Sequence, residues 1–270
     1  MLKSIKYVLH ENITNLYRIY SISKYEILSD MRDSKLGMFW NFANPAIQVL
    51  TYWLVFGVIM PGRSEQDNIP YLCWLLGGIV VWFYISPCIT NGCNAIYAKR
   101  DIITKMKFPV SILPATVILK ELFNHVCLMV ILVILFAVFG YFPNLHWLGL
   151  IYYLICACVF SIALSMTTSV LNMMARDTRK LILACMRLLL YLTPVLWSPS
   201  KLDAHPILAF IMKFNPIDYI VQGYRDCFFF HQGIASFGIQ IFIFWGITLL
   251  LLAFGSFMLY KFKHKFMDML

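Results

Sequence analysis

Residues 32–60 read RDSKLGMFWNFANPAIQVLTYWLVFGVIM, and this stretch decides the class of fold. Its part 38–60 is 23 residues long and holds no charged side chain. A helix needs about 20 mostly apolar residues to cross a bilayer. The charged lead with Arg32 and Lys35 is typical of a segment that stays in the cytosol. The stretch therefore predicts a first transmembrane helix that starts on the cytosolic side.

Similar runs follow along the chain. Of its 270 residues, 61% are hydrophobic and 13% are charged, so polar groups are too few to cover a globule in water. The strict alternation of a membrane β-barrel is absent, so the backbone must be satisfied within helices. We predict an all-α membrane protein with six transmembrane helices, at 38–60, 71–90, 122–139, 147–171, 181–197 and 237–260.

The placement of Lys and Arg predicts the orientation. Segments 1–37, 91–121, 172–180 and 261–270 hold 17 of the 22 basic residues, which places them and both termini in the cytosol. This bias and the attraction to anionic lipids account for most of the net charge of +9, so we expect no nucleic-acid partner. A basic collar for an anionic substrate is an alternative use of part of this charge.

The amino-terminal region is predicted to be a cytosolic segment, 1–37, ahead of one transmembrane domain, 38–270. Residues 1–12 lack the long apolar core of a signal peptide, so we expect the segment to stay attached. Over 13–31 the apolar residues fall mostly at helical spacing among charged ones. The pattern predicts an interfacial helix on the cytosolic membrane face, or alternatively a soluble helix packed on a partner subunit.

Two cytosolic connections could transmit motion from a partner subunit to the membrane helices, and we call them lever segments. Residues 94–105 predict a short helix that Pro109 ends, with four possible contacts: Ile96, Tyr97, Ile102 and Ile103. Residues 174–180 form a tight charged turn between the predicted fourth and fifth spans. Each segment either receives the motion of a partner or is only a polar connection.

The outer connection between the fifth and sixth spans is long and apolar. About forty residues follow Pro194 before the last span, too many for a simple hairpin. Residues 205–212 and 217–226, separated by Asn215-Pro216, predict a re-entrant helical hairpin in the outer leaflet. It either caps a translocation path or forms a rigid lid with no transport role.

Side chains for catalysis or ion coupling are scarce. None of the six predicted spans contains Asp or Glu, which argues against ion-coupled transport. No GxxxxGK[ST] loop is present, so we expect no ATP on this chain and an energy source on another subunit. The scattered His and Cys residues lack metal-ligand spacing, so we expect no metal and no catalytic residue.

Two features of the predicted fourth and fifth spans stand out. Small residues recur at every fourth position, which favours close helix packing over a hydroxyl-lined pore, and they are Ala157, Ser161, Ser165 and Ser169. Arg187 is a lone cation in the fifth span, and such a charge needs a carbonyl, an acid, water or a phosphate.

Several short motifs resemble the polysaccharide-export branch of the ABC-2 permeases. They are DSKLGMFW at 33–40 with NP at 44–45, KMKFP at 105–109, RDTR at 176–179, TPVLW at 193–197, and NP at 215–216 followed by GYRD at 223–226. Their order and spacing extend over nearly the whole chain. Within this branch the sequence looks most similar to wall teichoic acid translocation permeases, with O-antigen and capsular polysaccharide permeases next.

The resemblance implies a homodimer bound to two copies of a separate ATPase subunit, which would hold ATP and Mg while this chain binds no cofactor. The complex would export an undecaprenyl-pyrophosphate-linked anionic polymer, wall teichoic acid, across the cytoplasmic membrane. Spans one and five would border a lateral gate for the lipid carrier, and the outer hairpin would form the outer gate.

The resemblance and the residue chemistry together suggest two sets of site residues. The expected ATPase contacts are Ile96, Tyr97, Arg100, Ile102, Arg176, Asp177 and Arg179. Basic side chains suit phosphates and aromatic rings suit sugars, so the expected substrate path comprises Arg32, Lys35, Phe39, Trp40, Lys105, Lys107, Arg187, Tyr191 and Trp197.

Functions of other classes remain open from the residues. A passive lipid scramblase would share the fold and need no nucleotide. An integral membrane glycosyl- or phosphotransferase is disfavoured, because no paired acids or His clusters lie near the membrane surface. ATP-stimulated turnover separates the exporter from the scramblase.

Overall fold

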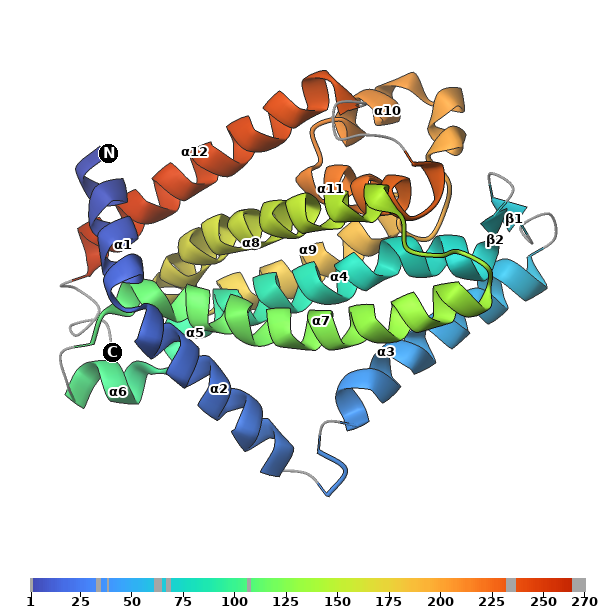
Figure 1. The fold of residues 1–270 in the computed structure, drawn as a ribbon. Helices are drawn as coiled ribbons and strands as arrows, with labels where there is room; N and C mark the ends of the chain where they lie inside the picture. The colour runs from blue at the N-terminus through green and yellow to red at the C-terminus, as the bar shows by residue number, and fades with distance from the viewer. Residues whose placement is uncertain are drawn as a thin grey trace.

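The computed structural model describes residues 2–32, 35–37, 39–60, 65–66, 69–105, 108–231 and 237–263. Figure 1 shows long helices that run side by side, with shorter helices gathered at both ends. Apart from a two-stranded hairpin, β1 (Glu65–Gln66) and β2 (Ile69–Pro70), all regular structure in these residues is helical. The long helices are α3 (Phe39–Tyr52), α4 (Tyr71–Cys93), α7 (Leu113–Val138), α8 (Gly149–Met174), α9 (Asp177–Leu192) and α12 (Ile239–Phe262).

Five helical stretches are long and apolar enough to cross a membrane, which confirms five of the six predicted spans. They are Phe39–Ile59, Tyr71–Cys93, Val110–Val138, Leu145–Met174 and Ile239–Phe262. Short helices extend three of them: a π-helix at Trp53–Ile59 after α3, and 3-10 turns at Val110–Ile112 and Leu145–Leu148. The chain is thus a multi-pass membrane protein.

The third span begins earlier than the sequence analysis predicts. We expected it at 122–139, but the helical stretch starts at Val110 and includes Lys120 and Glu121. The helical stretch that contains the third span thus holds an acid, Glu121, in its cytosolic half. The charges are tolerated because each has a partner: Lys120 lies 2.6 Å from the carboxylate of Asp30, and Glu121 accepts amide hydrogen bonds.

The predicted fifth span is shorter than the others. Its helix, α9, has 16 residues, which corresponds to about 24 Å, less than the roughly 30 Å of a bilayer core. It ends at Leu192, two residues before Pro194, because a proline disfavours helical backbone in the residue that precedes it. The helix is confirmed, whereas its crossing of the membrane stays a prediction, because α9 is absent from the five stretches.

The amino-terminal segment folds as two helices, α1 (Leu2–Thr14) and α2 (Leu16–Arg32), where one helix over 13–31 was predicted. In Figure 1, α1 crosses the end of the bundle beside α12, and α2 slants away along α7. The phenol of Tyr7 donates a 2.8 Å hydrogen bond to Glu11 and packs on the ring of Tyr260. Burial and Glu11 raise the pKa of Tyr7 to about 12, so this donor persists at neutral pH.

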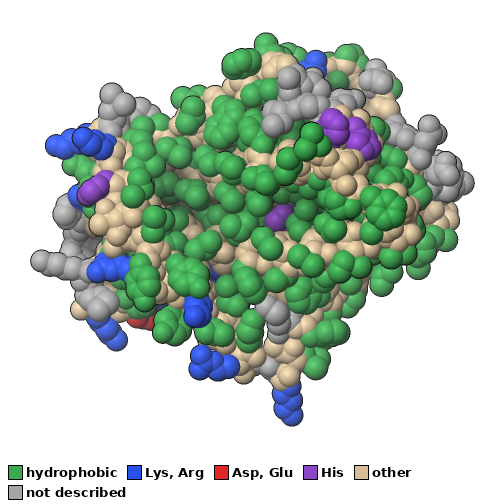
Figure 2. Space-filling model, viewed as in Figure 1, with side chains coloured by type: hydrophobic (Ala, Val, Ile, Leu, Met, Phe, Trp, Pro, Cys, Tyr) green, Lys and Arg blue, Asp and Glu red, His purple; other side chains and the backbone are tan. Residues whose placement is uncertain are grey.

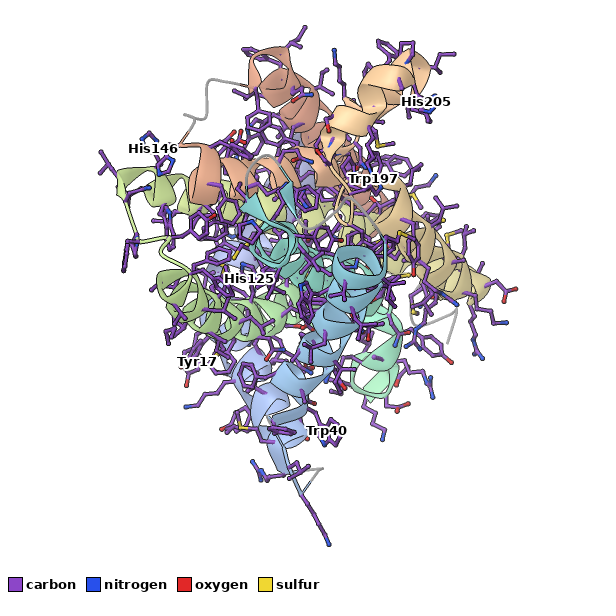
Figure 3. All side chains as sticks on the ribbon, turned by 90° about the vertical axis from the view of Figure 1, so that its right-hand side faces the viewer. Tyr17, Trp40, His125, His146, Trp197 and His205 are labelled. Carbon is purple, nitrogen blue, oxygen red and sulfur yellow. The ribbon has the colours of Figure 1, made fainter. Side chains whose placement is uncertain are left out.

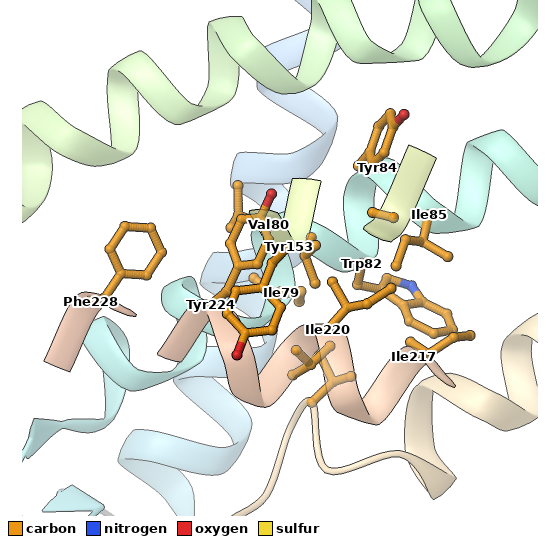
Figure 4. Close-up of a cluster of buried hydrophobic side chains, with 14 of the residues drawn as sticks. Ile79, Val80, Trp82, Tyr84, Ile85, Tyr153, Ile217, Ile220, Tyr224 and Phe228 are labelled. Carbon is orange, nitrogen blue, oxygen red and sulfur yellow. The ribbon is translucent and has the colours of Figure 1, made fainter. Parts of the chain in front are cut away.

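The core lies between α4, α8 and α11 (Pro216–Arg225). Figure 4 shows aliphatic and aromatic side chains of these helices interleaved around Tyr153 and Tyr224. In the most apolar part of α4, 72% of the residues are buried, against 6% in the first span. Glycines permit this central position, because a Cβ on Gly77, Gly78 or Gly92 would overlap side chains of the neighbouring segments.

The small residues of α8 pack closely against neighbouring helices, as predicted. All four are fully buried, and they are Ala157, Ser161, Ser165 and Ser169. The hydroxyl of Ser165 donates a 3.0 Å hydrogen bond to the carbonyl of Cys88 in α4, and a Cβ on Gly92 would overlap it. These residues serve helix packing and line no pore within the chain.

The outer connection contains the two predicted short helices. They are α10 (Pro206–Met212) and α11, separated by Asn215, whose side chain accepts a hydrogen bond from the backbone of Ile217. A 3-10 turn, Pro199–Ala204, precedes them and a π-helix, Asp226–Phe230, follows. Their position in the outer leaflet stays a prediction.

We expect Gly223→Ala to detach α11 partly from the core. An added Cβ would overlap the ring of Tyr153, and overpacking of this kind costs about 1–3 kcal/mol. Differential scanning fluorimetry in detergent should show a melting temperature lower by several degrees. The matched control is Gly246→Ala in α12, where nothing lies within 4 Å of the new Cβ. Equal melting of both variants would contradict close packing at Gly223.

Candidate functional site

A buried arginine at the end of α11 holds the segment that follows α9. The guanidinium of Arg225 donates to the carbonyls of Pro194 at 2.6 Å and Val195 at 2.7 Å. It also lies 3.4 Å from the ring centroid of Trp74, and only 1% of Arg225 is exposed. The missing side chain of Gly78 leaves the space that the guanidinium occupies. We call this arrangement the outer lock.

Two further hydrogen bonds fix the same segment. The side-chain amide of Asn215 donates to Thr193 at 2.8 Å, and the hydroxyl of Tyr71 donates to the carbonyl of Leu196 at 2.9 Å. Three consecutive carbonyls at 194–196 are thereby satisfied by side chains of α4 and α11. The outer lock ties the end of α9 to both helices.

The sequence analysis missed this role for Arg225, which it included only in the GYRD motif at 223–226. One signal was present: Ile217, Val221 and Arg225 are spaced four residues apart and therefore share one face of α11. An arginine on an otherwise apolar face indicates a buried cation with fixed acceptors.

At the cytosolic end, the two predicted lever segments meet. The predicted helix at 94–105 is two helices, α5 (Ala95–Ala98) and α6 (Arg100–Lys105). The ring of Tyr97 lies between two guanidinium groups, with Arg100 at 4.7 Å and Arg176 at 5.0 Å from its centroid. The amide of Asn172 also donates to Asn94 at 3.3 Å. We call this surface the cytosolic platform.

The expected ATPase contacts divide into exposed and buried residues. Arg100, Ile102, Arg176, Asp177 and Arg179 are exposed on the cytosolic platform, and Tyr97 is half-buried. Ile96 is 0% exposed and packs in a small core with residues of α1, α7 and α8. Ile96 therefore anchors α5 to the bundle and offers no surface to a partner in this chain.

A row of amides links three spans near the same end. Asn41 of α3 donates to Asn124 at 3.1 Å, and Asn124 donates to Glu121 at 3.3 Å. Glu121 also accepts from Asn91 of α4 at 3.1 Å. Because α3 makes few other contacts with the bundle, this row is a main attachment of its cytosolic half.

The first span and α9 each have a face that is exposed in the single chain. Exposed large apolar side chains extend along both helices, including Ile47, Leu50, Leu181 and Leu188. Asn44, Gln48 and Thr51 form an exposed polar stripe on α3, since they are spaced four and three residues apart. Tyr52 and Tyr191 interact through their hydroxyls, so the two helices are neighbours. We call this surface the α3/α9 face.

Arg187 lies exposed on the α3/α9 face. Its Nε donates a 3.3 Å hydrogen bond to the carbonyl of Leu183 in its own helix. Within the described residues no acid forms an ion pair with it. The guanidinium thus satisfies part of its need within α9 and keeps further donors for another group.

The other expected substrate residues lie at separate ends. Arg32, Lys35, Phe39 and Trp40 are exposed around the turn between α2 and α3, and Lys105 is exposed at the end of α6. Lys107 lies outside the described residues. Trp197 donates from its indole to the carbonyl of Tyr191 at 2.9 Å. Figure 3 shows Trp40 and Trp197 far apart, so a single chain does not join these residues into one site.

The described residues offer surfaces for other molecules and no centre for catalysis by a metal ion. The described residues contain no group of three or more His, Cys, Asp or Glu side chains that would hold a metal ion. They present a cytosolic platform, a bare face that extends along the spans, and a locked outer segment at the far end of the same helix, α9. These are features of a multi-pass membrane protein with surfaces left open to other molecules.

The chain belongs to the ABC-2 type transporter family, because residues 17–229 match this family. It is accordingly the transmembrane component of an ABC transporter. The chain is similar to an O-antigen export system permease protein RfbA from Myxococcus xanthus, with 27% identity over 79% of this chain and 81% of the relative. A protein of the same name from Klebsiella pneumoniae is 27% identical over 88% and 89% of the two chains.

Proposed function

We propose that this chain is the permease subunit of an ABC exporter that moves a lipid-linked polysaccharide of the O-antigen type across the cytoplasmic membrane. The observation that carries the proposal is the similarity to O-antigen export permeases over most of both chains. The sequence analysis placed wall teichoic acid first. The relatives favour its alternative, an O-antigen-like polysaccharide, and give no specific support to teichoic acid.

The proposed exporter is a homodimer with two copies of a separate ATPase subunit that binds ATP and Mg. The α3/α9 face supports the dimer, because a second copy would cover its exposed apolar residues and enclose the polar stripe of α3. The cytosolic platform is the proposed ATPase contact. Closure of the ATPase dimer would push α5 and α6, and Tyr97 would pass the motion to Arg176 at the start of α9.

The proposed substrate path follows the basic and aromatic residues at its ends. Arg32 and Lys35 lie beside Phe39 and Trp40, so phosphates of the carrier and sugar rings would meet suitable groups together at the cytosolic entrance. Lys105 and Lys107 would add to this basic rim. Tyr191 and Trp197 would continue the path toward the outer lock, with Arg187 between the two ends.

We expect Arg187→Ala to weaken the stimulation of ATP hydrolysis by the polymer. A charge-assisted contact contributes about 1.5–3 kcal/mol, so half-maximal stimulation should need roughly 10- to 100-fold more polymer. Basal hydrolysis should not change, because Arg187 is exposed and its side chain donates to a carbonyl of its own helix. Titration of lipid-linked polymer into the reconstituted complex measures the effect.

Two variants serve as controls for Arg187. Arg187→Lys keeps the charge and should retain part of the stimulation, and Cys185→Ala alters a neighbouring exposed position without a charge. Unchanged half-maximal stimulation in Arg187→Ala, at normal expression, would remove Arg187 from the path.

Affinity purification of the chain from its native membrane in mild detergent tests the proposal as a whole. We expect a stoichiometric ATPase and a lipid-linked polysaccharide to co-purify. Co-purification of a polyol-phosphate polymer in place of the polysaccharide would indicate that the exported substrate is teichoic acid. A chain that purifies alone and moves lipids between leaflets of vesicles without nucleotide would be a scramblase.

A further inference from the structure

An apolar groove lies between the amphipathic helix α2 and the third span. It has a volume of about 490 Å³, and its walls include Leu28 and Met31 of α2 and Leu122, Phe123 and Val126 of α7. A pocket of this size is large enough for a small apolar ligand. Phe123 and Val126 are exposed on the span α7, so lipid can reach the groove.

The groove is a fixed feature, because α2 is attached to the bundle at several points along its length. Ser23 is buried and donates a 2.8 Å hydrogen bond to the carbonyl of Thr116 in α7. The carboxylates of Glu26 and Asp30 each lie 2.6 Å from a lysine of the bundle, Lys99 and Lys120 respectively. The two helices are therefore held together beside the groove while a gap remains along it.

The charge at the rim of the groove is positive. Lys24 is the charged residue among those that line it, and its side chain is exposed. The two acids of α2 are engaged by Lys99 and Lys120, and Lys24 forms no ion pair within the described residues. Figure 2 shows Lys and Arg side chains along the lower and left rim of this face and hydrophobic side chains over most of the rest.

We propose that this groove binds one acyl chain of an anionic phospholipid from the cytosolic leaflet, with the lipid phosphate at Lys24. An apolar cleft beside a single unpaired cation, at the boundary between an amphipathic helix and a span, matches both parts of such a lipid. The bound acyl chain would fill the gap between α2 and α7 and would hold α2 at the membrane surface. The site is separate from the α3/α9 face and from the cytosolic platform.

Photolabelling of the purified full-length chain tests this site. The chain is reconstituted in phosphatidylcholine vesicles that contain a small fraction of phosphatidylglycerol with a photoactivatable acyl chain, and labelled peptides are mapped by mass spectrometry. We expect label on residues 27–31 and 119–126 above the level on the exposed side chains of α12. Lys24→Glu should reduce this label by about fivefold or more, since it replaces attraction to the phosphate by repulsion.

Matched variants separate the effect of the Lys24 charge from the effect of the groove itself. Arg18→Glu makes the same charge change on α2 at an exposed position that does not line the groove, and it should leave the label unchanged. Val126→Trp should reduce the label by filling the groove while Lys24 is kept. A circular dichroism melt confirms that each variant is folded.

Three results would overturn the proposal. The first is label spread evenly over α7 and α12, which indicates ordinary boundary lipid. The second is equal labelling by phosphatidylcholine and phosphatidylglycerol probes, or equal labelling of Lys24→Glu and the wild-type chain. Either result would show that the groove does not select an anionic headgroup through Lys24. The third is displacement of the label by undecaprenyl phosphate at lower concentration than by phosphatidylglycerol, which assigns the groove to the carrier lipid.

Discussion

Replacing Arg225 with Met is expected to abolish export and to lower the melting temperature of the chain by about 10 °C. Its guanidinium satisfies the buried carbonyls of Pro194 and Val195, and Met has no donor to replace it. Each buried carbonyl left without a partner costs about 1–3 kcal/mol, and the lost stacking on Trp74 adds to this. The end of α9 would then separate from α4 and α11.

Thermal unfolding in detergent and export by the reconstituted complex measure this effect. Arg225→Lys tests geometry, because a lysine keeps the charge but does not span two carbonyls as a guanidinium does. It should recover stability only in part. Lys213→Met removes an exposed cation between α10 and α11 and should change neither measurement. Wild-type melting and export in Arg225→Met would show that the outer lock is dispensable.

Tyr97→Asp is expected to reduce export by tenfold or more while the chain stays folded. The ring of Tyr97 lies between Arg100 and Arg176 and so joins α5 and α6 to the turn before α9. Each cation-π contact at such an exposed site contributes about 0.5–1 kcal/mol, so global stability should fall only slightly. An aspartate at position 97 removes the aromatic ring on which Arg100 and Arg176 pack, and with it the contact between α5–α6 and the turn before α9.

ATP hydrolysis and export, measured on the same preparation, identify the step that fails. Hydrolysis that continues without export indicates an uncoupled platform, and loss of the ATPase during purification indicates a detached one. Tyr97→Phe keeps the ring and should behave as wild type. Lys180→Ala alters the same turn at an exposed residue paired only with Asp177 and should also behave as wild type. Normal export by Tyr97→Asp would remove Tyr97 from the coupling route.

Prediction from the sequence was most reliable for helices that are apolar along their whole length. The second span needed no correction of type or position, because α4 carries no charge and lies in the centre of the bundle. The third span was misplaced by nine residues or more because Lys120 and Glu121 look like the end of an apolar run. Their partners Asp30 and Asn91 come from distant segments, and a local pattern does not reveal them.

The candidate site was predictable in its segments and less so in its residues. Asn215-Pro216 marked the border between the outer helices correctly, because a side-chain cap and a proline act within a few residues. Ile96 was expected to contact the ATPase because it lies in the predicted helix 94–105, yet tertiary packing buries it. The meeting of Tyr97 with Arg176 depends on how α4 and α8 bring their cytosolic ends together.

By itself the sequence determined that this is a helical multi-pass membrane protein, because the hydrophobic effect and the backbone's need for hydrogen bonds act on each segment alone. The motifs also indicated the ABC-2 family before any geometry was known. Only the tertiary structure decided that Arg225 is the buried tie of the outer segment, that Glu121 accepts a hydrogen bond from Asn91 of α4, and that α2 leaves a groove beside α7. Each of these depends on partners more than 25 residues apart in the chain, which no local pattern specifies.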